Sequence, residues 1–387
     1  MSLDPQLFKP HVAKVAGKLI DVAEGIAEGR VTPREVQENP FRDALRERTA
    51  MAFVTPLIIA INVGLFLTIA YKVDGPVGDP QTLLNWGANF GPVTTNGGWW
   101  RLVAAMFLHA GFIQLVVNMA GLAQAGLILE RLVGRLALVT TYLGAGILAR
   151  LLSMSQDPLG VTYGSSAAIF GVYGLFAATC LLGIRGRTAA SIPIGELKKL
   201  VPAAGIFFLY NLGVGGQHHL LAFGLGFAGG IVMAMGISER KAQGARVAVT
   251  AAATAIAIGF MSVPLRGIAD VRPQITILNA LEVKTTSAYD LAMLRFRNNR
   301  ITRDGLAKII DGEILPSLAS AQERLLAIRG VPAQHRPIVA SADEYLRLRQ
   351  DSFRLRLEGL RKSSMKTLQQ AEVKEIAARE ALEKVKL

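Results

Sequence analysis

The sequence predicts an all-α membrane protein, in which a core of six transmembrane helices is followed by a seventh and by a helical region outside the membrane. Two observations lead to this fold class. Of the 387 residues, 51% are hydrophobic and only 18% are charged, whereas soluble domains carry roughly 25% charged residues. The hydrophobic residues also occur in blocks, and a bilayer core of about 30 Å needs roughly 20 of them per helix.

Seven segments are apolar enough to be transmembrane helices. The connection between the first two is long and ends at Trp99 and Trp100, residue types that favour the membrane–water interface. The fifth segment is the shortest, and Asn211 interrupts its end. We therefore expect residues 51–240 to form the six-helix core and residues 246–265 to form the seventh helix. The seven segments cover residues 51–71, 101–128, 133–154, 164–184, 199–213, 218–237 and 246–265.

The charges in the loops predict the orientation of these helices, because lysine and arginine gather on the cytoplasmic side. Arg131 and Arg135 lie between the second and third segments, whereas residues 155–163, before the fourth, contain neither residue type. This alternation places the N-terminus in the cytoplasm and residues 266–387 outside. We expect a multi-pass protein of a bacterial plasma membrane.

The N-terminus and the composition argue against several classes of protein. Residues 1–50 lack the uninterrupted apolar core of a signal peptide, so we interpret them as a cytosolic helical segment broken by Pro33 and Pro40. Cys180 is the single cysteine, which excludes an intramolecular disulfide. The net charge is +13, but no basic stripe interleaved with aromatic residues indicates nucleic-acid binding.

The C-terminal region, residues 266–387, differs from the rest in its polarity. It contains 22 lysine and arginine residues against 15 aspartate and glutamate residues. Helix-forming residues predominate, and Pro316, Pro332 and Pro337 divide the region into a few pieces. We find no catalytic motif in it and interpret it as a helical appendage or a surface for a partner.

Ser166 and His219 are the candidate pair for chemistry. Ser166 begins the fourth apolar segment and His219 begins the sixth, at the same end of the bundle. Small residues follow each of them at helical spacing, and two such faces pack closely in membranes. We therefore expect the two side chains to meet at one depth. The small residues are Ala222, Gly226 and Gly230 after the histidine, and Ala167, Gly171, Gly174 and Ala178 after the serine.

This pair has the chemistry of acyl transfer. A serine hydroxyl is a weak nucleophile that needs a base within hydrogen-bond reach, and an oxyanion needs hydrogen-bond donors. The free N–H groups at the start of the serine helix and the amide of Asn118 are candidate donors. The fourth and sixth segments contain no aspartate or glutamate, so the sequence predicts a dyad rather than a triad.

Other interpretations of the same residues stay open. A serine such as Ser165 or an asparagine such as Asn118 within a membrane commonly joins helices by hydrogen bonds. A histidine at the end of a membrane helix can simply lie at the interface. The adjacent His218 and His219 can each bind a metal, but neighbouring positions point to different sides of a helix, so we expect no metal site.

Several motifs follow one another over residues 83–235. They are residues 83–92 as a first loop; Trp99-Trp100-Arg101-Leu102, Phe107-Leu108-His109-Ala110-Gly111 and Asn118; Glu130 with Gly134; Gly164-Ser165-Ser166-Ala167; and His219 with Gly226. Their order and spacing resemble the rhomboid family of intramembrane serine proteases.

The resemblance implies an endopeptidase that cleaves transmembrane segments of other membrane proteins within the lipid bilayer, without a metal or a small-molecule cofactor. It also implies roles for individual residues. Ser166 would be the nucleophile, His219 the base, Asn118 and Gln114 the oxyanion donors, and Phe170, His109 and Gly164 supporting residues.

Three positions depart from the family pattern. Gln114 stands where a histidine is usual, and Ala167 and Ala222 replace glycines. One alternative is therefore a catalytically weak or inactive rhomboid-like protein that binds membrane clients. Another is a transporter or channel with a polar path, although the sequence shows no internal repeat typical of many transporters. For a protease, the short segment 199–213 is the expected gate for substrate entry from the lipid.

Overall fold

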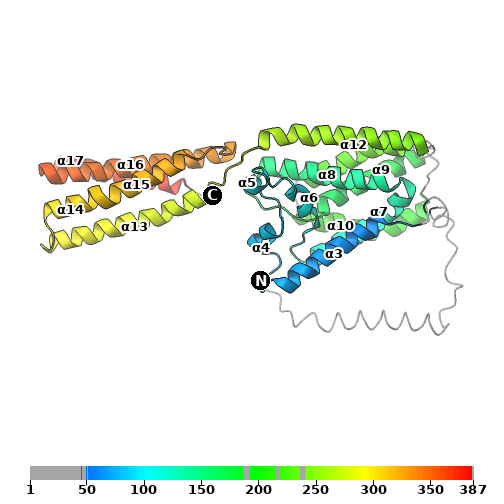
Figure 1. The fold of residues 1–387 in the computed structure, drawn as a ribbon, viewed down its shortest axis with the longest axis horizontal. Coiled ribbons are helices and arrows are strands. Elements are labelled where there is room, and N and C mark those ends of the chain that lie inside the picture. Colours follow the sequence, from blue (N-terminus) through cyan, green and yellow to red (C-terminus); the bar gives the residue numbers. More distant parts are fainter. Residues whose placement is uncertain are drawn as a thin grey trace. The chain divides into compact units, whose positions relative to one another are not determined.

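The computed structural model describes Leu45, Thr49 and residues 51–185, 192–214, 218–235 and 240–385. The predicted N-terminal helical segment lies almost entirely outside these residues. The described residues form helices with one isolated β-bridge, between Asn89 and Thr162. They confirm the predicted all-α class (Figure 1).

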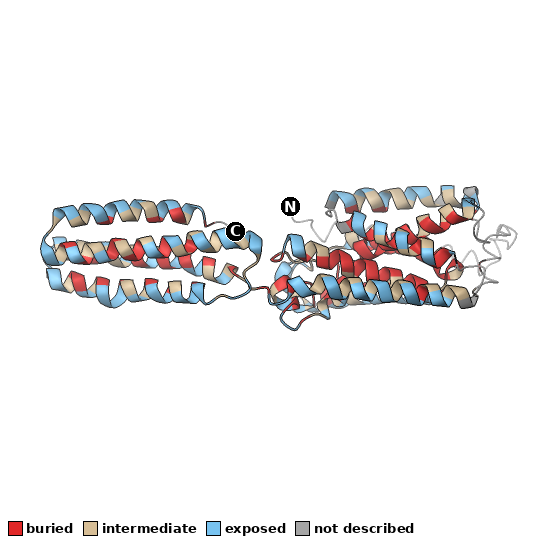
Figure 2. Ribbon diagram, turned by 90° about the horizontal axis from the view of Figure 1, so that it is seen from above, coloured by how far each residue is buried: buried red, intermediate tan, exposed pale blue. Residues whose placement is uncertain are grey.

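The helices before residue 266 include five that are long and apolar enough to cross a membrane, and two shorter apolar helices. The predicted number of seven transmembrane segments therefore stays a prediction. Buried residues gather where these helices face one another (Figure 2). The long helices are α3 (Val54–Lys72), α7 (Phe112–Leu132), α8 (Arg135–Gln156), α9 (Ser166–Ile184) and α12 (Arg240–Ser262); α10 (Ile194–Val214) and α11 (His218–Ala234) contain the shorter apolar stretches.

The predicted start of the second segment is wrong. The chain from residue 101 forms α6 (Arg101–Ala104) and the short helix η3 (Ala105–Phe107), and α7 begins only at Phe112. The backbone is extended at Leu108 and Gly111, which interrupts the helix. This break places His109 in a connection rather than on a helix, and its side chain is fully buried there.

Asn211 interrupts the apolar run at the end of the fifth predicted segment but does not interrupt the helix α10. The helix continues to Val214. The side-chain amide of Asn211 donates a hydrogen bond of 2.9 Å to the carbonyl of Phe207 one turn earlier. A buried polar side chain that bonds to its own helix in this way is satisfied without a partner helix.

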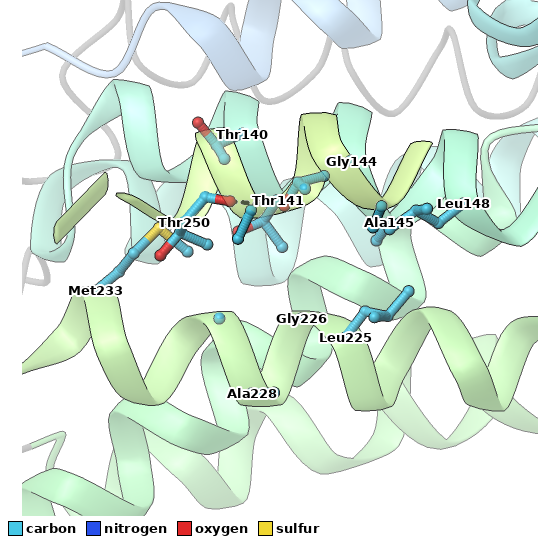
Figure 3. A pocket seen from close by; sticks show the side chains of 14 residues that line it. Thr140, Thr141, Gly144, Ala145, Leu148, Leu225, Gly226, Ala228, Met233 and Thr250 are labelled. Atoms are coloured by element: carbon cyan, nitrogen blue, oxygen red, sulfur yellow. Dashed lines mark hydrogen bonds between the residues drawn. The ribbon is translucent and has the colours of Figure 1, made fainter. Parts of the chain in front are cut away.

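A cavity of about 210 Å³ lies between α8, α11 and α12 (Figure 3). Glycine, alanine and threonine form most of its wall. The hydroxyls of Thr250 and Thr254 donate to carbonyls one turn earlier on their own helix, at 2.9 and 2.8 Å. The described residues that line it include no histidine, serine, cysteine or charged side chain, so this cavity offers no group for acid–base chemistry.

Glu130, near the end of α7, caps the start of α3. Its buried carboxylate accepts hydrogen bonds from the backbone N–H groups of Phe53, Val54 and Thr55, at 2.6, 2.8 and 2.8 Å. The first turn of a helix leaves such N–H groups without partners in the helix, and in a membrane each unsatisfied one is costly. Glu130 therefore joins two helices that are 76 residues apart in the sequence.

Residues 272–383 form a second group of helices with a hydrophobic core of its own. Pro316 and Pro337 stand in the first turns of their helices, where a missing N–H costs nothing. An unpredicted break occurs at Ser363, which adopts a left-handed φ of 54°. The helices are α13 (Arg272–Arg297), α14 (Arg303–Ile309), the π-helix η5 (Ile310–Ile314), α15 (Leu315–Leu326), the short helix η6 (Ala333–His335), α16 (Arg336–Lys362) and α17 (Met365–Glu383).

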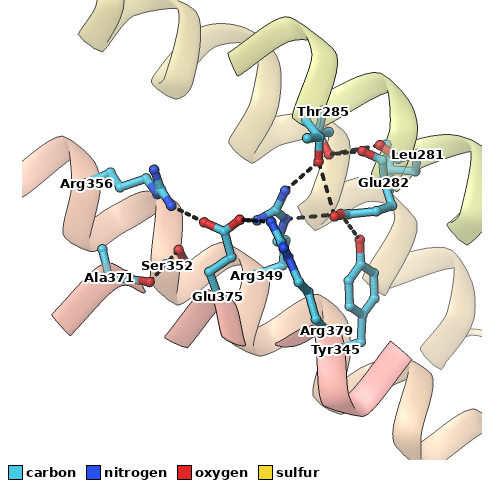
Figure 4. A network of polar contacts seen from close by, with 11 residues as sticks. Leu281, Glu282, Thr285, Tyr345, Arg349, Ser352, Arg356, Ala371, Glu375 and Arg379 are labelled. Carbon is cyan, nitrogen blue, oxygen red and sulfur yellow. Dashed lines mark hydrogen bonds and ion pairs between the residues drawn. The ribbon is translucent and has the colours of Figure 1, made fainter. Parts of the chain in front are cut away.

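A buried ionic network joins three of these helices (Figure 4). Arg349 on α16 lies between two carboxylates, 3.1 Å from Glu282 on α13 and 3.3 Å from Glu375 on α17. Glu375 also pairs with Arg356 and accepts a 2.7 Å hydrogen bond from Arg379. Removing a carboxylate partner would leave the buried charge of Arg349 without part of its compensation, so we expect such a change to destabilise the packing of these helices.

The network predicts a pH dependence of the C-terminal helices. Burial alone raises the pKa of Glu375, but Arg356, Arg349 and Arg379 outweigh it and hold that pKa below its ordinary value. A carboxylate with a depressed pKa contributes stability that is present above its unfolded pKa of about 4.5 and is lost as the pH falls through the folded pKa. We expect hydrogen-exchange protection of α16 and α17, corrected for intrinsic exchange, to fall below about pH 4.5.

Glu375→Gln removes this titrating group. The hydrogen-exchange protection of α16 and α17 should then be lower at neutral pH and should fall less steeply below about pH 4.5. Glu380→Gln, an exposed change on the same helix, is the matched control and should leave the profile unchanged. If protection in Glu375→Gln fell below about pH 4.5 as much as in the wild type, the pH dependence would not arise from Glu375.

Candidate functional site

Ser166 and His219 meet at the starts of two neighbouring helices. Ser166 is the first residue of α9, and His219 lies in the first turn of α11. The serine Oγ and the histidine Nε2 are 2.8 Å apart, and both side chains are buried. This distance is a short hydrogen bond, so the two predicted residues have the contact that a serine nucleophile needs with its base.

The close approach of α9 and α11 explains how the two residues come together. A methyl group added to Gly226 would overlap the backbone of Gly171, and one added to Gly174 would overlap the carbonyl of Phe223. Glycine is therefore required at both positions because backbone faces backbone there. The predicted packing of two small-residue faces is confirmed.

Aromatic rings hold the imidazole in place. Phe170, one turn after the serine, stacks on His219 with ring centroids 4.9 Å apart and an interplanar angle of 22°. Phe207 and Phe208 of α10 pack in turn on Phe170, at 5.1 and 4.9 Å. Phe170 was expected as a supporting residue, whereas the two rings behind it were not predicted, because their spacing on an apolar helix is not distinctive.

Gly164 shapes the approach to the serine. Its φ of 100° is a conformation that favours glycine. A Cβ built on it would lie 3.2 Å from Nε2 of Gln114 and 3.9 Å from Oγ of Ser166. The Oε1 of Gln114 accepts a hydrogen bond of 3.1 Å from the N–H of Ala110, and its amide NH₂ lies beside Gly164.

Asn118 and His109 form a neighbouring cluster with Ser165. The Nε2 of His109 lies 3.1 Å from Nδ2 of Asn118 and 3.2 Å from Oγ of Ser165. All three side chains are fully buried. This arrangement joins the connection before α7, α7 itself and the start of α9, so it braces the residue that precedes Ser166.

Arg150 of α8 is a further residue of the site that was not predicted from the sequence. Its Nη2 donates a 2.6 Å hydrogen bond to the carbonyl of Gly164. It also lines a cavity of about 30 Å³ with Ser166 and His219. Arg150 is the single charged residue in the apolar stretch 136–156, and this was the signal that would have found it, since charges at membrane depth are rare and functional.

Metal ligands do not gather in the described part of the chain. No group of three histidine, cysteine, aspartate or glutamate side chains lies close enough there to hold an ion. The side chain of His218, the other candidate ligand, lies outside the described residues.

The fold and site define a class: a multi-helix protein of the membrane whose buried serine and histidine form a hydrogen-bonded pair. Comparison with known proteins gives the related family. Residues 96–240 match the model of the Rhomboid domain. This stretch is therefore similar to the Rhomboid domain, and with its apolar helices the chain is an integral membrane protein. Its predicted orientation and bacterial origin stay predictions, because its relatives come from several kingdoms.

Curated relatives match along this domain. YdcA of Bacillus subtilis (strain 168), which carries a rhomboid-protease name, is 32% identical over 124 residues, 32% of this chain and 60% of that protein. Rhomboid-like protease 3 of Toxoplasma gondii is 28% identical over 167 residues, 43% and 62% of the two chains. Rhomboid protease GluP of Bacillus subtilis (strain 168) is 28% identical over 213 residues, which are 54% of this chain and 39% of that protein. The chain thus spans less than two thirds of each of these relatives. No solved structure gives a significant match.

Proposed function

We propose that the chain is an intramembrane serine endopeptidase that cleaves transmembrane segments of other membrane proteins. The observation that carries the proposal is the 2.8 Å contact between Ser166 Oγ and His219 Nε2, at the starts of two membrane helices. The protease names of the relatives support the reaction class. The departures Ala167 and Ala222 are buried in the packed core and leave this contact in place.

The geometry supports a two-step acyl transfer. Ser166 Oγ attacks the scissile carbonyl carbon as His219 Nε2 accepts the hydroxyl proton, and the histidine then gives that proton to the leaving amine. A water molecule, activated by the same histidine, hydrolyses the resulting ester. The backbone N–H of Ser166, at the start of α9, and the amide of Gln114, beside Gly164, are the candidate donors for the developing oxyanion. Asn118, the other predicted donor, has its amide nitrogen 3.1 Å from Nε2 of His109, so its role as an oxyanion donor stays a prediction.

Labelling with a serine-directed fluorophosphonate tests the proposal. We expect the wild-type protein in membranes to become covalently labelled, because a serine paired with a histidine is activated and a lone membrane serine is not. Ser166→Ala should lose the label completely. Ser165→Ala is the matched control on the adjacent serine and should keep it. A folded wild-type protein that takes no label, or a label that persists in Ser166→Ala, would contradict the proposal and favour a client-binding protein.

A further inference from the structure

A short connection joins α12, the last apolar helix, to α13, and it is bonded to neighbouring segments on both sides. The N–H of Ile268 donates to the hydroxyl of Thr95 at 3.0 Å, and its carbonyl accepts from the side-chain amide of Asn96 at 2.9 Å. Thr95 and Asn96 lie in the loop before α6. The N–H of Ala269 donates to the carbonyl of Gly330, in the C-terminal region, at 3.0 Å. The connection is therefore held in place along its length.

Val271, the last residue of this connection, is fully buried. It forms a small hydrophobic cluster with Phe90 and Leu159. Phe90 belongs to the long loop between α3 and α7, and Leu159 belongs to the loop 157–165, which leads from α8 to Ser166. One side chain next to the C-terminal helices thus packs on two loops of the membrane domain. Partly buried residues of the C-terminal region pack on the same cluster: Ile328, Val331 and Val339.

The same two loops are paired beside this cluster. Asn89 and Thr162 form the isolated β-bridge, with backbone hydrogen bonds of 3.0 and 2.8 Å, and their side chains are joined by a third bond of 2.9 Å. Asn89 directly precedes Phe90, and Thr162 follows Leu159 in the loop 157–165. Even a complete pair of isolated strands is only marginally stable in water. A bridge of one residue pair therefore depends on the hydrophobic packing next to it.

The bridge is close to the reacting groups. Thr162 lines the cavity of about 30 Å³ together with Ser166 and His219. The loop 157–165 continues directly into α9, whose first residue is Ser166. A displacement of this loop moves both the nucleophile and its backbone N–H. A shift of about 1 Å at a catalytic group can cost about 100-fold in rate.

We propose that Val271 is a positioning residue for catalysis: by packing on Phe90 and Leu159 it holds the loop 157–165 in the place where Ser166 reacts. This inference rests on the proposed function. It gives the connection to the C-terminal helices a part in the activity of the membrane domain. Val271 is fully buried and does not line the cavity beside Ser166, so it acts through the loop and not on the substrate.

Val271→Ala in the full chain, in proteoliposomes, tests this role. We expect kcat for a transmembrane substrate and the rate of fluorophosphonate labelling of Ser166 to fall about 10- to 100-fold. KM should stay near the wild-type value, because the change removes no contact with the substrate. A purely structural role would lower the melting temperature and leave both rates of the folded protein unchanged. Unchanged rates below the melting temperature would overturn the inference.

Leu357→Ala is the matched control. Leu357 is buried in the core of the C-terminal helices, near the C-terminal end of α16. The change removes more apolar volume than Val271→Ala and should lower the melting temperature of the C-terminal helices. It should leave kcat and the labelling rate unchanged. Equal losses of rate in the two variants would show that general destabilisation is the cause, and would overturn the inference.

Hydrogen exchange separates failure of this inference from failure of the proposed function. If the wild-type protein takes no label and cleaves no substrate, the protease proposal fails. Positioning is then measured at the N–H groups of Asn89 and Thr162, which form the backbone bonds of the bridge. Their protection should fall at least about tenfold in Val271→Ala and stay unchanged in Leu357→Ala. Protection that is unchanged in Val271→Ala would overturn the inference.

Discussion

Replacing His219 with alanine should lower the rate of substrate cleavage by at least about 10³-fold, since the serine then has no base. The 2.8 Å contact with Ser166 is the observation behind this expectation. Within the bilayer, water and buffer are poor substitutes for the missing base because the site is buried. The measurement is the first-order cleavage rate of a transmembrane substrate in proteoliposomes.

Two controls separate loss of the base from loss of the fold. The thermal unfolding of His219→Ala in detergent should stay close to that of the wild type apart from the lost packing on Phe170, which makes a ring contact at 4.9 Å. His335→Ala replaces a histidine of the C-terminal helices and should leave the cleavage rate unchanged. A folded His219→Ala protein that cleaves within tenfold of the wild-type rate would rule out the dyad.

The parts of the fold that sequence reasoning predicted depend on local signals. The length of the apolar blocks predicts membrane helices, and the spacing of Gly171, Gly174 and Gly226 predicts where two of them touch. Both patterns predict the folded structure directly. In lipid the backbone must satisfy its own hydrogen bonds and so forms helices, and small residues permit close packing of two helices. The meeting of Ser166 and His219 follows from these two facts.

The parts that escaped prediction depend on partners distant in the sequence. In the sequence Glu130 is part of a turn motif, and only the structure shows that it accepts hydrogen bonds from three backbone N–H groups at the start of α3. In the sequence Arg150 is an isolated charge in an apolar segment, and only the structure shows that it donates a hydrogen bond to the carbonyl of Gly164. The break between η3 and α7 has a similar origin, because the extended backbone at Leu108 places His109 beside Ser165 and Asn118. The hydropathy of a segment does not indicate which distant residues will pair with it.

The contact between α9 and α11 gives the second large effect, on stability as well as activity. Gly226→Ala adds one methyl group, which would overlap the backbone of Gly171. Backbone atoms cannot rotate away as a flexible side chain can, so the two helices must separate. Overpacking in a close-packed core costs typically 1–3 kcal/mol, and we expect about 3 kcal/mol or more here. Separation also moves His219 from Ser166, so labelling and cleavage should both be lost.

Gly224→Ala is the matched control on the same helix. A methyl group there meets nothing within 4 Å, and alanine is the better helix former by about 1 kcal/mol. Thermal unfolding of the two variants in one detergent should therefore differ in direction, with Gly226→Ala melting well below the wild type and Gly224→Ala at or above it. If both variants melted alike, the tight packing of α9 on α11 would not be what holds the serine and histidine together.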